Sequence, residues 1–393
     1  MQYRENPRNG DQLSALGYGC MRFTRKGGVI DQEKADRELA LALEKGVNYF
    51  DTAYIYPGSE ACLGEFLRDH DCRERVKIAT KLPQYRIRKT EDFERFFREE
   101  LDRLQTDYVD YYLMHMLNDR TSWERLCALG LREWVEEKKK SGAVRNIGFS
   151  FHGGQAPFRE LLDAYDWDFC QIQYNYLDEH AQAGVEGLRY AHEKGMPVII
   201  MEPLRGGRLT HALPVAARQV FEKAAPGRSL ADWGFSWLLN QREVTVVLSG
   251  MNDPGQVEEN CGIFSRVMPD SLTEAEMEAY RLAVEAIRDS GEIGCTGCGY
   301  CQPCPRHVDI PTCFAIYNHS RSDHYMTALK EYMMCTTLRN VRTNASQCVG
   351  CGKCEEHCPQ HLKIREELRK VTKRLETPVY RIGALVLSRV MKY

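Results

Sequence analysis

The sequence between Gly46 and Glu60 reads GVNYFDTAYIYPGSE, and it decides the fold that we predict for this chain. Residues 47–50 form a short apolar run that predicts a buried strand, and Asp51 stands where this strand gives way to a loop. Tyr56 follows five residues later. Barrels of alternating strands and helices carry their chemistry at such strand ends, so a carboxylate followed by a phenol is a candidate proton-transfer pair. Taken alone, the same two residues could equally order a turn.

Two further predicted strands end in polar residues. VKIAT at residues 76–80 leads into Lys81, and VDYYLM at residues 109–114 leads into His115. The C-terminal ends of parallel barrel strands meet at one mouth, so we expect both side chains to lie near Asp51.

Asp51, Tyr56, Lys81 and His115 together resemble the catalytic tetrad of the aldo-keto reductases. The resemblance implies that Lys81 helps Tyr56 to release its proton, because a nearby positive charge stabilises a phenolate. Asp51 would hold Lys81, and His115 would orient a substrate carbonyl while Tyr56 protonates its oxygen. The resemblance also implies NAD(H) or NADP(H) as cofactor and a small-molecule carbonyl or alcohol as substrate.

Strand-like and helix-like segments alternate over residues 1–290. A turn signal at Asn9-Gly10, between residues 1–5 and 13–15, resembles the hairpin that closes the bottom of the family's barrel. The expected strands lie at residues 16–20, 47–50, 76–81, 108–115, 143–149, 169–173, 197–201 and 244–249. Helical periodicity covers residues 31–45, 60–69, 90–104, 123–141, 155–165, 181–194 and 229–240. This order predicts an α/β fold, a (β/α)₈ TIM barrel.

Later strand ends resemble the family's cofactor site. Ser150 and Gln171 match a serine and a glutamine that contact the nicotinamide amide, although Phe151 replaces an asparagine often found there. Met201 stands where many relatives have a tyrosine that stacks on the nicotinamide, which predicts weaker stacking. The loop after the seventh strand resembles the one that covers the pyrophosphate. Its expected contacts are Pro203, Leu204, Arg205 and Gly207.

The segment after the eighth strand resembles the part of the family that binds adenosine. Its expected contacts are Ser249, Gly250, Gln256 and Asn260. Residues 249–260 contain no Lys or Arg. Because a 2′-phosphate is usually held by cations, this composition favours NAD over NADP.

Eight of the 16 cysteines lie in two tight groups behind the barrel. CTGCGYCQPCP begins at Cys295, and CVGCGKCEEHCP begins at Cys348. The second run has the C-x₂-C-x₂-C-x₃-C-P spacing of bacterial two-cluster ferredoxins, in which the fourth cysteine serves the other cluster. The first run is one residue shorter between its last two cysteines. The sequence therefore predicts two [4Fe-4S] clusters, one held by Cys295, Cys298, Cys301 and Cys358 and the other by Cys348, Cys351, Cys354 and Cys304.

Paired zinc sites are the competing interpretation, but zinc needs neither a third cysteine at this spacing nor a Cys-Pro ending. Cys313, Cys335 and the six cysteines of the barrel are expected to be ordinary buried thiols. The N-terminal sequence MQYRE has no secretory character, so the many thiols favour a reducing cytoplasm. We expect neither a transmembrane span nor a nucleic-acid partner.

Charge divides unevenly along the chain. Residues 1–290 carry 38 Lys and Arg against 47 Asp and Glu, whereas residues 291–393 carry 15 against 9. We expect a small α-helical ferredoxin-like domain at residues 291–362 and a helical tail at residues 363–393, which turns from basic to apolar after Pro378 and retains Arg381 and Arg389. The tail is expected to dock on the barrel or on the second subunit of a homodimer, with a membrane-surface helix as the alternative. Its charge could offset the clusters or steer an acidic redox partner.

Three functions remain open at this point. The first is an NAD(P)-dependent oxidoreductase that interconverts a carbonyl and an alcohol by hydride transfer, with the clusters relaying electrons or shaping the site. The second is a ferredoxin-linked electron-transfer enzyme whose barrel binds nucleotide or substrate without ordinary hydride chemistry. The third is a redox-sensing NAD(P)-binding protein. The tetrad favours an enzyme, because a sensor has no need of Tyr56 beside Lys81.

Overall fold

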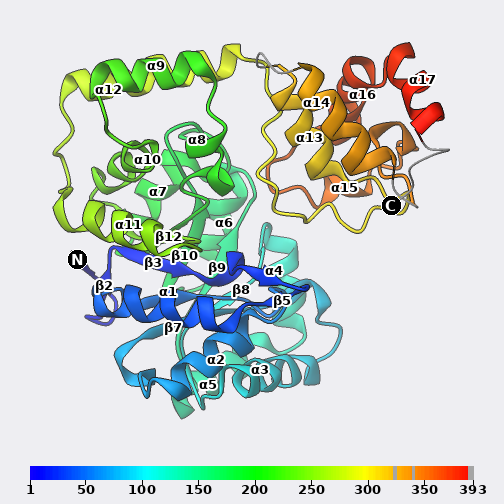
Figure 1. The fold of residues 1–393 in the computed structure, drawn as a ribbon. Coiled ribbons are helices and arrows are strands. Elements are labelled where there is room, and N and C mark those ends of the chain that lie inside the picture. The colour runs from blue at the N-terminus through cyan, green and yellow to red at the C-terminus, as the bar shows by residue number, and fades with distance from the viewer. Residues whose placement is uncertain (322–324, 339–340, 388–393) are drawn as a thin grey trace. The chain divides into compact units, whose positions relative to one another are not determined.

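Eight parallel strands close into a barrel in the computed structural model, which describes residues 1–321, 325–338 and 341–387 (Figure 1). In order around the barrel they are β3 (Leu16–Gly19), β6 (Tyr49–Asp51), β7 (Lys77–Leu82), β8 (Val109–Met114), β9 (Val144–Phe151), β10 (Phe169–Gln173), β11 (Val198–Met201) and β12 (Val244–Ser249). Each strand pairs in parallel with the next, and β12 pairs with β3 to close the ring. The predicted (β/α)₈ barrel is thus confirmed.

Large apolar side chains fill the inside of the barrel. Tyr49 and Tyr111 meet there with ring centroids 5.2 Å apart, and the ring of Phe169 lies 5.0 Å from that of Tyr111. Such a filled interior is a packed core rather than a pore, so open space for a ligand exists only beyond the strand ends. The buried cluster comprises Leu13, Tyr49, Ala79, Tyr111, Leu113, Phe169, Ile199, Val246 and Leu248.

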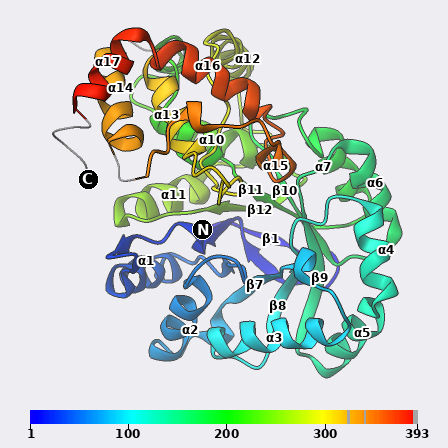
Figure 2. The same cartoon turned by 90° about the vertical axis from the view of Figure 1, so that its right-hand side faces the viewer.

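Helices ring the outside of the strands (Figures 1 and 2). They are α1 (Gln32–Glu44), α2 (Ser59–Asp69), α3 (Glu91–Leu104), α4 (Arg120–Ala128), α5 (Leu131–Ser141), α6 (Gln155–Ala164), α7 (Gly184–Glu193), α10 (Leu230–Leu239) and α11 (Pro254–Arg266). Side-chain caps start several of them: Asp31 accepts from the amide of Lys34 at 3.2 Å, and Asp119 accepts from the amide of Ser122 at 2.6 Å. These caps satisfy amides that have no partner within the first turn.

Two helical predictions differ from the structure. The helix expected over residues 123–141 is two helices, because Gly130 takes a left-handed φ of 88° between α4 and α5 and ends the first one. The segment expected to bind adenosine also begins a helix, α11, which Asp253 caps and Pro254 opens. Proline at the first helical position costs no hydrogen bond, so the sequence did carry a signal for this helix.

The predicted N-terminal hairpin is present as β1 (Tyr3–Glu5) and β2 (Gln12–Ser14), which pair antiparallel. Arg4 donates to the carbonyls of Leu239 at 2.9 Å and Gln241 at 3.0 Å. These carbonyls end helix α10, where a cation is favourable. A second small hairpin, β4 (Arg25–Lys26) and β5 (Val29–Ile30), was not expected.

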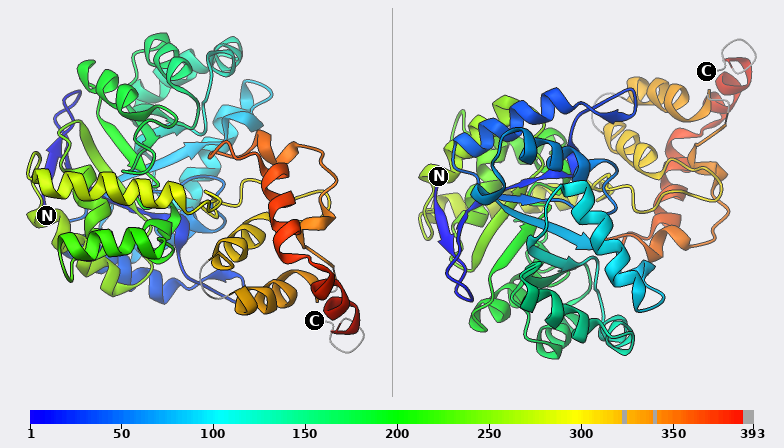
Figure 3. Two further views of the ribbon diagram at one scale, coloured as in Figure 1. Left: turned by 90° about the horizontal axis from the view of Figure 1, so that it is seen from above. Right: turned by 90° about the horizontal axis from the view of Figure 1, so that it is seen from below.

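A second compact unit combines residues 205–227 with the chain from Glu278 onward, while the barrel unit comprises Met1–Leu204 and Arg228–Met277. The second unit therefore includes the loop that follows β11. Its helices are α8 (Arg208–His211), α9 (Val215–Ala224), most of α12 (Glu274–Asp289), α13 (Ile310–His319), α14 (Tyr325–Tyr332), α15 (Lys353–Glu356), α16 (Ile364–Leu375) and α17 (Pro378–Leu387). Figure 3 shows α13, α14 and α16 lying together.

One apolar core holds α13, α14, α16 and α17 of the second unit. Phe314 and Tyr317 of α13 pack with Leu368 and Val371 of α16 in this core. The predicted tail is helical as α16 and α17, and Tyr380 of α17 is buried in the same core. Arg389 and the other residues from 388 to 393 lie outside the described residues.

Helix α2 approaches the end of α3 closely at Gly64. A Cβ at Gly64 would lie 2.2 Å from the carbonyl oxygen of Arg103, so Gly64→Ala should lower the free energy of unfolding by about 1–3 kcal/mol. Gly262→Ala is the matched control, because nothing lies within 4 Å of that position on α11. The control should raise the stability by about 0.5–1 kcal/mol, since alanine favours the helix. Urea titrations followed by tryptophan fluorescence report on the barrel, which holds all five tryptophans.

Candidate active site and cluster-binding region

A buried ion pair forms the base of the candidate site at the barrel mouth. Lys81, at the end of β7, donates from Nζ to Asp51 Oδ1 at 2.6 Å and to the carbonyl of Thr52 at 2.7 Å. The side chain of Lys81 is 1% exposed and that of Asp51 is 5% exposed. A buried pair of this kind persists only when its remaining hydrogen-bonding capacity is also satisfied.

Gln171 completes the environment of the carboxylate. Its Nε2 donates to Asp51 Oδ2 at 2.9 Å, so both carboxylate oxygens have a donor. The sequence placed Gln171 near the nicotinamide, and the structure brings this glutamine from β10 directly to Asp51. Gln171 therefore links the tetrad to the side of the site expected to hold the cofactor.

Tyr56 and His115 lie close to this pair. Lys81 Nζ is 5.1 Å from the centroid of the Tyr56 ring, and the rings of Tyr56 and His115 meet edge to face with centroids 6.1 Å apart. The structure thus brings together all four residues of the tetrad. Tyr56 is partly exposed while the other three are buried, so the phenol is the most accessible member of the group.

His115 is held in its neutral form. Burial, followed by the charge on Lys81 and the neighbouring His152, lowers the pKa of His115 well below its usual value. A neutral imidazole can donate one hydrogen bond without adding a second positive charge beside Lys81.

A second layer of polar contacts supports the strand that carries Lys81. Thr80 donates to Glu60 Oε1 at 2.6 Å, and Arg103 donates to Glu60 Oε2 at 3.1 Å. Burial raises the pKa of Glu60, while Thr80 and Arg103 act against that shift. Sequence reasoning did not identify Glu60, although it stands at the start of α2, just behind the loop of Tyr56.

Several residues expected to contact adenosine or nicotinamide form hydrogen bonds to the loops around them. Ser150 accepts from the amide of Met116 at 2.9 Å. Asn260 donates to Ser249 Oγ at 3.1 Å, which ties α11 to the end of β12. Gln256 accepts from the amide of Asn252 at 3.1 Å and so fixes the turn after Gly250.

Two basic side chains from distant parts of the sequence lie beside residues 249–260. A Cβ at Gly250 would meet the side chain of Arg22 at 3.2 Å, and Lys34 donates to the carbonyl of Asn252. Lys34 also pairs with Glu38 at 2.5 Å. The segment lacks cations in sequence but not in space, because the loop after β3 and helix α1 supply them.

The loop expected to cover the pyrophosphate belongs to both units: residues up to Leu204 are part of the barrel unit, and residues from Arg205 are part of the second unit. Met201 packs against the barrel core, and Pro203 is buried. From Arg205 the chain belongs to the second unit, and Gly207 takes a left-handed φ of 92° that suits glycine.

Arginines of this loop hold the chain that leads into the first cysteine run. Arg205 donates to the carbonyl of Gly294 at 3.1 Å, and Arg208 donates to the carbonyl of Ile293 at 2.5 Å. Arg208 also pairs with Glu292 at 2.8 Å. The structure thus gives Arg205 a partner next to Cys295, in addition to the cofactor contact that the sequence predicts.

The other cysteines of the first predicted set act on the pKa of Cys301. Burial, and then the charges on Cys295, Cys298 and Cys358, raise the pKa of Cys301 to about 12. Cys358 comes from the second run, more than fifty residues away, so the fold brings the two runs together as the ferredoxin spacing requires. Bound iron reverses such a shift, because a coordinating thiol loses its proton.

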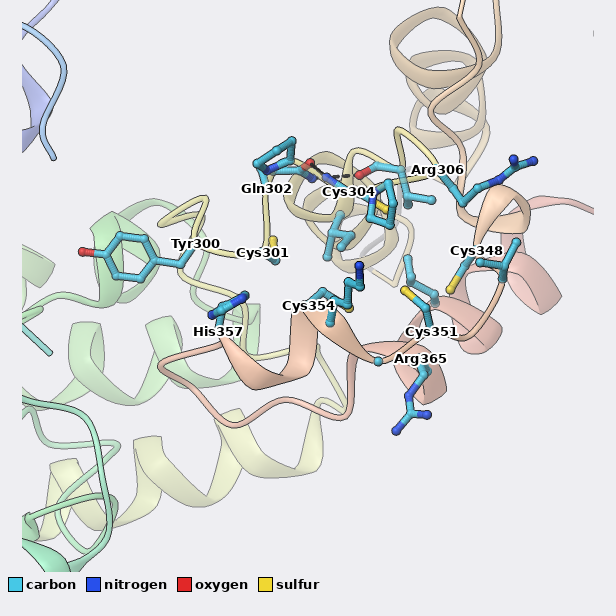
Figure 4. A pocket seen from close by; sticks show the side chains of 18 residues that line it. Tyr300, Cys301, Gln302, Cys304, Arg306, Cys348, Cys351, Cys354, His357 and Arg365 are labelled. Atoms are coloured by element: carbon cyan, nitrogen blue, oxygen red, sulfur yellow. Dashed lines mark hydrogen bonds between the residues drawn. The ribbon is translucent and has the colours of Figure 1, made fainter. Parts of the chain in front are cut away.

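The second set surrounds one hollow of about 180 Å³ in the second unit (Figure 4). Cys304 comes from the first run, and Cys348, Cys351 and Cys354 come from the second; Cys301 of the first set also lines this hollow. Burial, then Glu355 and the charges on Cys348 and Cys304, raise the pKa of Cys354 to about 11. Across the described ranges, no three His, Cys, Asp or Glu side chains are placed to hold a metal ion.

Comparison with known proteins identifies both parts of the chain. The sequence profile described as "Aldo/keto reductase family" matches residues 15–280, and that described as "4Fe-4S dicluster domain" matches residues 294–362. The chain belongs to the aldo/keto reductase family. It is an oxidoreductase of that family with a C-terminal 4Fe-4S dicluster domain.

Related proteins cover the barrel of this aldo/keto reductase. The oxidoreductase YrpG of Bacillus subtilis is 32% identical over 238 residues, which are 53% of this chain and 68% of that protein. L-Galactose dehydrogenase of Arabidopsis thaliana is 27% identical over 303 residues, 69% of this chain and 91% of that enzyme. The holo form of an aldo-keto reductase from Bacillus halodurans, at 25% identity, superposes with a TM-score of 0.60 over 73% of this chain and 97% of its own. No helix in the described part of the chain is long and apolar enough to cross a membrane.

The neutral state of His115 predicts a pH dependence for this aldo/keto reductase. The unfolded chain protonates this histidine near pH 6.5 and the folded chain resists doing so, hence folding stability is complete above that pH and falls as the pH decreases. The wild type should lose about 1.4 kcal/mol per pH unit below pH 6.5 relative to His115→Gln. Urea titrations at pH 5.5, 6.5 and 7.5 measure this difference. Parallel pH profiles for the two proteins would contradict a neutral His115.

Proposed function

We propose that this aldo/keto reductase interconverts a small-molecule carbonyl and an alcohol by hydride transfer with NAD(H) or NADP(H). The observation that carries the proposal is the cluster of Asp51, Lys81, Tyr56 and His115. It combines a buried ion pair, a phenol ring 5.1 Å from the ammonium, and a neutral imidazole at one barrel mouth.

Each member of the tetrad has a role in the proton transfer. Tyr56 gives its proton to the carbonyl oxygen during reduction and takes it back during oxidation of the alcohol. Lys81 stabilises the phenolate left on Tyr56, and Asp51 keeps Lys81 at a fixed distance. His115 donates a hydrogen bond to the same oxygen and orients the carbonyl. The reduced nicotinamide supplies the hydride when it is bound.

Polar groups around the mouth suit a nicotinamide nucleotide. We assign the nicotinamide amide to Ser150 and Gln171, which are both buried and lie opposite each other on the neighbouring strands β9 and β10. The remaining contacts are assigned to Met201, Pro203, Leu204, Arg205, Gly207, Ser249, Gly250, Gln256 and Asn260. An aldo-keto reductase structure from Klebsiella pneumoniae was solved with NADPH, and the fission yeast relative yakc is named for NADP(+). With Arg22 beside Gly250, these names support NADP(H) as well as NAD(H).

The dicluster domain is proposed to hold two [4Fe-4S] clusters. Cys295, Cys298, Cys301 and Cys358 would hold one cluster, and Cys348, Cys351, Cys354 and Cys304 would hold the other. The mutual electrostatic effects within each set support this assignment. A [4Fe-4S] cluster supplies one-electron transfer when it is bound. We therefore assign the domain to electron exchange with a ferredoxin or another redox partner, and the chain to the reducing cytoplasm, where such thiols persist.

Replacement of the proposed proton donor tests the barrel chemistry. Tyr56→Phe should lower the rate of carbonyl reduction by about 10²–10⁴-fold, because the oxygen loses its proton source. Binding of NADPH should stay within about two-fold of the wild type, since the phenol hydroxyl acts on the substrate. NADPH oxidation with a panel of small aldehydes, and nucleotide binding by fluorescence titration, provide the two readouts. Unchanged reduction by the variant would contradict the role of Tyr56.

Iron analysis tests the crossed cysteine sets. Cys358→Ser should lose about half of the bound iron. The cluster lost should be that of Cys295, Cys298 and Cys301, although Cys358 belongs to the second run. Cys304→Ser should do the reverse, and the electron paramagnetic resonance signals of the two variants should differ. Cys313→Ser is the control: this thiol lies buried in the core of the second unit outside both sets, so the iron content should not change. Loss of the same cluster in both variants would contradict the crossed assignment.

A further inference from the structure

A basic stripe runs along helix α16. Arg365, Arg369 and Lys373 stand at i, i+4 and i+8, so their side chains follow one side of the helix. All three are exposed. The buried side of α16 is formed by Ile364, Leu368, Val371 and Leu375, which anchor the helix in the core of the second unit. The stripe is therefore held in place by packing on the other side of the helix.

The basic stripe lies beside the second cysteine run. A shallow hollow of about 470 Å³ is lined by the stripe and by the turn that contains Cys348, Val349 and Gly350. The neighbouring hollow, around the second cysteine set, shares Cys348 and Arg365 with it. The basic stripe thus lies next to the turn between Cys348 and Cys351.

Charged residues that line these two hollows are all basic. They are Arg306, Lys353, Arg365, Arg369 and Lys373. Glu355, which lies outside this lining, pairs with Arg365 at 2.7 Å. The lining of the two hollows contains five cations and no carboxylate, so the lining itself is positively charged.

The centre of this surface is apolar and lies at the ligand loop. Val349 is 63% exposed, and Cys351 is also exposed. An apolar centre with a charged rim is the usual composition of a protein-binding surface. Here the apolar residue stands between two predicted ligands of one cluster, so a partner on this surface would sit directly against the cluster loop.

We propose that this surface docks a small acidic protein that carries single electrons, such as an iron-sulfur or flavin carrier. The proposal rests on the cluster assignment given under the proposed function. One electron leaves the reduced carrier and enters the cluster of Cys304, Cys348, Cys351 and Cys354. The carrier is oxidised by one electron and the cluster is reduced by one, while no bond changes and no proton moves. The basic stripe aligns the acidic face of the carrier and speeds its approach.

Binding by the protein with both clusters in place tests the proposal. The probes are an acidic plant-type [2Fe-2S] ferredoxin, an acidic flavodoxin, and the basic carrier cytochrome c, each measured anaerobically by calorimetry. The acidic carriers should bind, should bind more weakly as salt is raised, and should lose at least about tenfold in affinity with Arg369→Glu/Lys373→Glu. The neutral pair Arg369→Gln/Lys373→Gln should lose less. Cytochrome c should not bind the wild type.

The matched control uses two lysines that line neither hollow. Lys363, the residue before α16, and Lys370 of α16 are exposed, so Lys363→Glu/Lys370→Glu changes the net charge equally and should keep the affinity within about two-fold. Iron content and visible absorption confirm that each variant retains its clusters. Equal losses from both reversed pairs, or no binding of either acidic carrier, would overturn the proposal. Binding of a DNA duplex through the stripe in place of the carriers would also overturn it.

Independent readouts separate this proposal from the barrel chemistry. Carbonyl reduction with NADPH needs no carrier, so reversal of the charges on Arg369 and Lys373 should leave it unchanged. If the carriers do not bind but carbonyl reduction is normal, only the docking proposal is contradicted. If the carriers bind but no carbonyl is reduced, the hydride-transfer proposal is contradicted and the docking proposal stands.

Discussion

The ion pair between Asp51 and Lys81 is the interaction on which the site depends. At 2.6 Å and almost fully buried, it brings two charges into a region where each alone would be costly. The carbonyl of Thr52 and the amide of Gln171 meet the remaining hydrogen-bonding capacity. Because strands β6, β7 and β10 supply these groups, the closed barrel is needed to assemble them. In return, the pair fixes a positive charge beside the ring of Tyr56.

A second constraint concerns the loop after β11. In sequence this loop continues from a barrel strand, yet from Arg205 onward it packs with the cysteine-rich unit. Arg205 and Arg208 hold the backbone at Ile293 and Gly294, just before Cys295. The same loop resembles the part of the family that covers the cofactor pyrophosphate. The segment that the resemblance assigns to the nucleotide thus belongs, from Arg205 onward, to the unit that carries the first cysteine run.

Much of this organisation could be predicted from the sequence, because it follows from local pattern. Strand ends carrying Asp51, Lys81 and His115 identify the barrel mouth, and the cysteine spacing identifies the second domain. Interactions between distant segments could not be predicted in this way. Arg22 reaches Gly250 across more than two hundred residues of chain, and no spacing rule connects them. The break at Gly130 was missed because helical periodicity continues across it, and the glycine acts through its backbone conformation.

We propose that the barrel passes a hydride directly, rather than single electrons through the dicluster domain. Reaction with [4,4-²H₂]NADPH and a panel of small aldehydes under anaerobic conditions, followed by mass spectrometry of the alcohols, distinguishes the two routes. We expect one deuterium on the carbinol carbon of each product, because the hydride goes from nicotinamide to carbonyl without exchange. Alcohol products that carry hydrogen from the solvent at that carbon would contradict it. They would show that electrons and protons arrive in separate steps.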